Sequence, residues 1–126
     1  MFHKALWSLE KHSRRGFRGY PLATVAFYGP DDQRASKVAV GIVQAEGAEA
    51  DPLQRWFSEH DDARADPGIA RQISEFIEAH GARSVVLVDR IIGCAHEERI
   101  DYPEGTACPL CPFWANRDRW SGQLLR

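Results

Sequence analysis

All three cysteines of this chain lie in one short stretch, together with a histidine that can share a metal ion with them. Cys108 and Cys111 form a Cys-x-x-Cys turn, which points two thiolates at one ion. Cys94 and His96 supply two further donors, because residues i and i+2 of an extended chain face the same side. Zinc prefers four such donors in a tetrahedron. The stretch therefore predicts a closed zinc site formed by Cys94, His96, Cys108 and Cys111, although iron accepts the same donors.

A second interpretation of these residues is catalytic. The run His96-Glu97-Glu98 followed by Cys108-x-x-Cys111 resembles the signature of zinc deaminases, in which one His and two Cys hold the metal and a Glu moves protons. The protein would then be a zinc-dependent hydrolase with Glu98 or Glu97 as general acid/base and a water on the metal. The short segment between the two half-motifs departs from that family. A Cys-x-x-Cys pair also occurs as a redox dithiol, usually near the start of a domain.

Carboxylates surround the predicted ligands. Glu97, Asp101 and Glu104 are candidates to hydrogen-bond to a ligating imidazole, as carboxylates do in many metal sites. The simpler explanation is an acidic loop that faces water. The pattern alone does not separate these two interpretations.

Arginines and aromatic residues gather in two places, and side chains of this kind contact phosphates and stack on bases. The residues concerned are Arg14, Arg15, Arg18, Trp114, Arg117 and Arg119. The formal net charge of −2 excludes a broadly basic nucleic-acid binder but not a local patch. We therefore favour the interpretation that the aromatic residues cover the metal-binding stretch, and nucleic-acid binding is a third hypothesis.

The rest of the chain predicts a small α/β (α+β) scaffold. Apolar residues at helical spacing predict a helix over residues 2–12. Strand-forming runs over 22–28 and 37–43 predict an antiparallel hairpin with a long loop. Asp-Pro pairs predict helix starts, because Asp caps a helix and Pro fits its first turn. They place a short helix at 51–57 and a longer one from Pro67 to about His80.

Residues 84–92 predict a buried central strand that the chain reaches through a helical crossover. The expected fold is thus a three-stranded mixed sheet with two to three helices and a C-terminal zinc-binding loop. Because sites of α/β folds lie beyond the carboxyl ends of strands, the stretch that follows this strand is where a site is expected.

A chain of 126 residues predicts a single domain, with a scaffold over 1–92, a metal-binding loop over 93–114 and a tail over 115–126. Three cysteines cannot form a complete intramolecular disulfide framework, which favours a reducing compartment. No apolar run reaches the length of a membrane span, and the N-terminus lacks a secretory apolar segment. We expect a cytoplasmic protein with no membrane partner.

The pattern Gly-Cys-x-His-Glu-Glu over 93–98, followed by Asp-Tyr-Pro-x-Gly-x-x-Cys-Pro-x-Cys-Pro-Phe-Trp over 101–114, resembles a family of small bacterial proteins of uncharacterised function. That family often has Pro at the position of Ala95 and Gly at that of Arg99. The resemblance implies a bacterial cytoplasmic protein and supplies no activity. The Cys-Pro-x-Cys turn alone resembles the knuckle of zinc ribbons and rubredoxins. The leading hypothesis is a binding or regulatory module with a structural zinc and an unknown partner.

Overall fold

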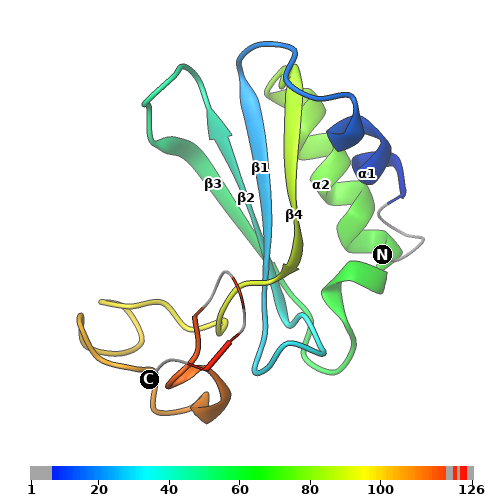
Figure 1. The fold of residues 1–126 in the computed structure, drawn as a ribbon. Coiled ribbons are helices and arrows are strands. Elements are labelled where there is room, and N and C mark those ends of the chain that lie inside the picture. The colour runs from blue at the N-terminus through cyan, green and yellow to red at the C-terminus, as the bar shows by residue number, and fades with distance from the viewer. Residues whose placement is uncertain (1–6, 119–120, 122, 125–126) are drawn as a thin grey trace.

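The structure, a computed structural model, describes residues 7–118, 121 and 123–124. It shows one four-stranded mixed sheet with two α-helices on the same face (Figure 1). In chain order the elements are α1 (Trp7–Arg14), β1 (Leu22–Tyr28), β2 (Lys37–Val43), β3 (Ala50–Phe57), the 3-10 helix η2 (Ala63–Ala65), α2 (Pro67–Ala79), β4 (Ser84–Ile91) and the 3-10 helix η3 (Pro112–Trp114). No helix in the described part has the length and apolar character that crossing a membrane requires.

The strand order is β3-β2-β1-β4. β2 pairs antiparallel with β1 and with β3, and β4 pairs parallel with β1 after the crossover through α2. The predicted hairpin of β1 and β2 is therefore confirmed. The prediction that residues 84–92 form the central strand is wrong: β4 lies at an edge, and Val86 on it is 47% exposed. The central strands are β1 and β2, because β3 covers the far side of β2.

β3 replaces the short helix predicted over 51–57, so the sheet has four strands rather than three. Its residues alternate between the two faces of the sheet, as strand geometry requires. Trp56 packs edge-on against Phe76 of α2, with ring centroids 5.9 Å apart, whereas Leu53 and Phe57 lie exposed on the opposite face. Backbone pairing with β2 therefore outweighs the local Asp-Pro signal for a helix.

The apolar core lies between the sheet and the helices. Asp66 caps α2 by accepting hydrogen bonds from the backbone amides of Gly68 and Ile69, as predicted. The buried isoleucines of α2 then face the fully buried side chains of β1 and β2 (Val25, Phe27, Val38, Val40 and Ile42). The helix predicted over 2–12 begins outside the described residues, and the described part, α1, continues to Arg14.

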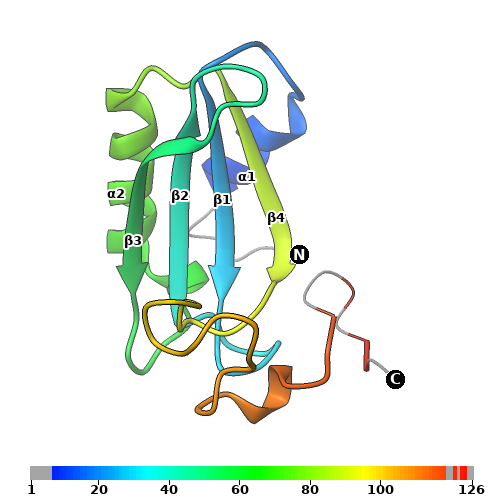
Figure 2. The ribbon, with the colours of Figure 1, turned by 90° about the vertical axis from the view of Figure 1, so that its left-hand side faces the viewer.

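Within the described residues, no helix covers the second face of the sheet, which Figure 2 shows from the front. This open face presents small residues on β1 and β2, among them Ala26 and Ala39, which are register partners. The segment after β4 crosses the lower end of this face, where β1, β3 and β4 end (Figure 2). The predicted site thus lies at the carboxyl ends of strands, at a corner between the open face and this segment.

Candidate metal centre

We call residues 93–114 the metal loop; it leaves β4 and is held at both ends by the turn after β1. The Gly29 amide donates to the Gly93 carbonyl at 2.9 Å, and the Trp114 indole Nε1 donates to the Gly29 carbonyl at 3.0 Å. A Cβ at Gly29 would lie 1.9 Å from the backbone oxygen of Arg34, so only glycine fits this turn. The two ends of the metal loop are thereby fixed to the same residue of the turn after β1.

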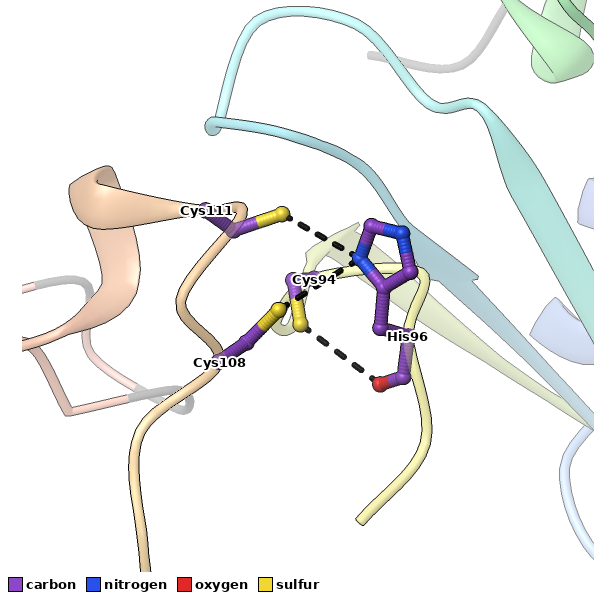
Figure 3. Close-up of side chains that lie close together, drawn as sticks. All are labelled: Cys94, His96, Cys108 and Cys111. Atoms are coloured by element: carbon purple, nitrogen blue, oxygen red, sulfur yellow. Dashed lines mark hydrogen bonds between the residues drawn. The ribbon is translucent and has the colours of Figure 1, made fainter. Parts of the chain in front are cut away.

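Four potential metal donors meet inside the metal loop (Figure 3). The Sγ atoms of Cys94, Cys108 and Cys111 and a ring nitrogen of His96 all lie within 4.8 Å of one another. His96 Nδ1 is 3.5 Å from Cys108 Sγ and 3.5 Å from Cys111 Sγ. The structure therefore brings together all four residues that the sequence selected as ligands.

The separations of His96 Nδ1 from the two sulfurs fit a thiol–imidazole hydrogen bond, and they also fit two ligands of one ion. Zinc lies about 2.3 Å from sulfur and about 2.0 Å from imidazole nitrogen, so a tetrahedron has S···N edges of roughly 3.6 Å. Both measured separations from Nδ1 are 3.5 Å. A single Nδ1 atom at the same distance from two sulfurs is compatible with a tetrahedral site, in which Nδ1 would be the donor atom of His96.

Burial and crowding of the three sulfurs oppose their ionisation when no cation lies among them. All three cysteines are buried, and none is in a disulfide. Burial raises the pKa of the Cys94 thiol, and burial together with the two neighbouring sulfurs raises the pKa of Cys111 to about 12. Three thiols in so small a volume do not all ionise unless a cation balances their charge. A divalent metal supplies that charge and favours the thiolates.

The Cys-x-x-Cys turn continues directly into η3. The Cys111 amide donates to the Cys108 carbonyl at 3.4 Å, and the Trp114 amide donates to the Cys111 carbonyl at 3.2 Å. Trp114 is buried beneath the turn and packs edge-on against Phe113, whose ring lies 4.2 Å from the Arg117 guanidinium carbon. Trp114 thus packs onto the turn after β1 and onto Phe113, whereas Trp120 lies outside the described residues, so the covering of the metal loop by these aromatic residues stays a prediction.

Glu97 connects the metal loop to the sheet. Its Oε2 lies 2.8 Å from Lys37 Nζ on β2, and Arg55 on β3 contacts both of its oxygens through Nε and Nη2. Lys37 also donates to the Ala95 carbonyl at 3.1 Å, between two of the predicted ligands. Burial alone would raise the pKa of Glu97, but the hydrogen bonds from Lys37 and Arg55 lower it on balance. We call Lys37, Arg55 and Glu97 the charged triad.

Sequence reasoning missed Lys37 and Arg55. Lys37 begins an apolar strand and is 3% exposed, which is unusual for a lysine without a partner. A lysine at the start of an otherwise apolar strand was the sequence signal that could have identified Lys37. Arg55 gave none, because its role depends on the strand assignment of β3.

The other carboxylates hold the metal loop rather than the histidine. Asp101 Oδ2 accepts from the Glu97 amide at 2.7 Å, and Glu98 Oε2 accepts from the Gly105 amide at 2.6 Å. Glu104 pairs with Arg99 on the surface. Within the described residues, no hydrogen bond joins His96 to Glu97, Asp101 or Glu104. Their proposed contact with a ligating imidazole is thus not formed.

The basic residues predicted as a nucleic-acid patch do not form one surface. Arg14, Arg15 and Arg18 lie near the amino end of β1, whereas Arg117 follows η3 at the opposite end of the sheet (Figure 1). Trp114 is buried and so presents no face for stacking. Arg119 lies outside the described residues.

A cavity of about 280 Å³ adjoins the predicted ligands at the corner between the metal loop and the open face. Cys94 and His96 form one wall, and residues of β2 and β3 form the other. No family model, no curated protein and no solved structure matches this chain. Its function must therefore be inferred from the site, a group of three cysteines and one histidine arranged as a metal centre.

Proposed function

We propose that Cys94, His96, Cys108 and Cys111 bind one zinc ion, and that this ion is structural. It fixes the metal loop at the end of the sheet, where the loop and the open face together form a binding surface. The convergence of four donor atoms within 4.8 Å, from two separate segments of the chain, carries this proposal. Four protein donors complete a tetrahedron and leave no position for a catalytic water.

Metal analysis of the purified protein tests the zinc site. We expect one zinc per chain in the wild type and loss of that zinc in the Cys108→Ala/Cys111→Ala variant, which removes two of four donors. His60→Ala is the matched control, because His60 is exposed and lies outside the cluster, and it should retain zinc. A wild type without stoichiometric metal, or zinc retained by the double variant, would contradict the proposal.

The alternative is a zinc-dependent hydrolase, and the cavity beside Cys94 and His96 is the observation in its favour. That function needs an open coordination position and a free general base. Glu98 is occupied by the Gly105 amide and Glu97 by two cations, so neither carboxylate is available as a base in this structure. The structural role of the metal is therefore the better supported proposal.

The Cys94→Ser variant separates the two functions. A structural site with four donors should lose zinc affinity when one thiolate is replaced by a hydroxyl, which is a poor zinc ligand. A hydrolase that uses His96, Cys108 and Cys111 would keep its full zinc content. Zinc affinity measured by competition with a chelator gives the answer directly.

A further inference from the structure

The connection between α1 and β1, residues 14–20, concentrates exposed positive charge, and we call it the arginine loop. It carries three exposed arginines, namely Arg14, Arg15 and Arg18. A fourth, Arg83, lies beside the loop, because a Cβ at Gly19 would be 3.3 Å from Arg83 Nη1. Within the described residues, none of these four arginines forms an ion pair. Four guanidinium groups at one corner of the molecule are therefore available to an external anion.

Acidic residues do not balance the charge of this corner. No Asp or Glu occurs in residues 11–30 or 79–88, the two segments that contribute the arginines. The carboxylates that flank these segments are Glu10 on α1 and Glu78 on α2, so the arginines remain in excess. The acidic residues between β2 and β3 belong to a hairpin that bends toward the open face, whereas the arginine loop crosses to the helix side (Figure 1).

A buried serine holds the arginine loop in one shape. The Arg18 amide donates to Ser84 Oγ at 2.7 Å, and Ser84 Oγ donates to the Gly19 carbonyl at 2.8 Å. Gly16 and Gly19 have positive φ angles of 78° and 104°, which glycine adopts freely. A loop that is already ordered loses less conformational entropy when it binds a partner.

An exposed aromatic ring stands between the arginines of the loop. Phe17 is 64% exposed, and Tyr20 packs edge-on against it with ring centroids 5.2 Å apart. A cavity of about 250 Å³ adjoins Phe17, and Leu22, Val85 and Val86 give it an apolar lining. This volume lies below the usual range for drug-sized ligands, so it suits a single ring system. An exposed ring next to cations is the combination that stacks on a base and contacts its phosphates.

We propose that the arginine loop binds single-stranded nucleic acid. One unpaired base stacks on Phe17 at the cavity, and the arginines contact the neighbouring phosphates. A duplex offers phosphates but no unpaired base, so a single strand is the preferred partner. The surface lies at the end of the sheet opposite the metal loop (Figure 1), so this inference goes beyond the proposed zinc site and does not depend on it.

Fluorescence anisotropy of the full-length protein with labelled oligouridylate and oligodeoxythymidylate tests this proposal. We expect saturable binding of at least one strand, with an affinity that falls roughly fiftyfold when the salt concentration rises about fourfold, since four arginines neutralise phosphates. Phe17→Ala should weaken binding by about tenfold, whereas Phe17→Trp should retain it because the stacking face is kept. Phe57→Ala is the matched control, because Phe57 is 63% exposed on the open face and should not affect binding.

The charge contribution has its own pair of variants. Arg15→Met should reduce both the affinity and the salt dependence, the latter by about 0.7 in the logarithmic slope. Arg71→Met, an exposed arginine of α2, should change neither. The proposal is overturned if no strand binds saturably at low salt, if a duplex of the same length binds as tightly, or if Phe17→Ala binds normally. Binding of phosphatidylserine vesicles without binding of either strand would also overturn it, in favour of a membrane surface.

Discussion

Arg99 has a backbone conformation that its own side chain opposes. Its φ of 75° lies in the left-handed region, and among the described residues no other non-glycine has a positive φ. A side chain in that region costs about 1 kcal/mol or more, whereas glycine adopts it freely. The structure explains why glycine suits this point of the metal loop.

Arg99→Gly should therefore stabilise the zinc-loaded protein by about 1 kcal/mol, measured by urea unfolding. The ion pair between Arg99 and Glu104 is exposed, so its loss should cost little. Arg99→Ala is the matched control, since it removes the same ion pair but keeps the left-handed strain. Equal stabilities of the Gly and Ala variants would contradict this explanation.

Glu97 is the residue on which the attachment of the metal loop to β2 and β3 depends. Glu97→Gln leaves the buried Lys37 ammonium without a charged partner. We expect the free energy of unfolding to fall by about 2 kcal/mol. This is less than the cost of breaking a fully buried ion pair, because Glu97 is partly exposed. The Glu97→Gln/Lys37→Met double variant should recover part of this loss, because it leaves no unpaired charge. Further destabilisation in the double variant would show that the charge pair is not the cause.

At the scale of elements, β3 decides the shape of the open face. As a strand it directs Trp56 toward α2 and leaves Leu53 and Phe57 on the open side. As a helix, the same segment would bury all three side chains together. Leu53 and Arg55 line the cavity because residues 50–57 form a strand, in which alternate side chains point to the same face.

Alanine substitutions distinguish these two structures of residues 50–57. Trp56→Ala should cost about 3 kcal/mol in the free energy of unfolding, because it removes a ring packed on Phe76 and a hydrogen bond to Gln72. Leu53→Ala should cost less than about 1 kcal/mol, because this side chain is 43% exposed. Similar costs at both positions, measured by urea unfolding, would favour a helix.

At the scale of the whole molecule, the sheet and the metal loop depend on different forces. The sheet and its helices form most of the apolar core, and the metal loop adds Cys94, Tyr102, Cys108, Cys111 and Trp114 to it; the rest of the loop consists largely of turns and bends. A metal that binds the folded loop stabilises it by its binding free energy. Loss of the metal should therefore loosen the loop before it unfolds the sheet.

Removal of zinc with a chelator should lower the midpoint of thermal unfolding and speed tryptic cleavage after Arg99, whose side chain is exposed but whose backbone is held in the folded loop. The far-ultraviolet circular dichroism of the sheet and helices should persist. Gel analysis of the digest gives the cleavage site, and re-addition of zinc should restore protection. Cleavage at Arg99 that is equally fast with and without zinc would contradict a structural role of the metal.

The sequence by itself determined the features that depend on neighbouring residues. The cap at Asp66, the isoleucine spacing of α2 and the clustering of all cysteines in one stretch are local patterns. The first two led to the helix that the structure shows, and the third led to a group of potential donors that the structure brings together. It also indicated that the metal loop follows a strand end. These properties are encoded within a few turns of chain, where propensity, capping and ligand spacing act.

Only the tertiary structure decided which strands are neighbours and which charges meet. β3 is a strand because β2 pairs with it, and β4 is at an edge because no strand lies beyond it among the described residues. The charged triad joins Lys37 to Glu97, 60 positions apart, so no local pattern reveals it. Sheet pairing and buried ion pairs are contacts between distant residues, whose free energy appears only once the chain is folded.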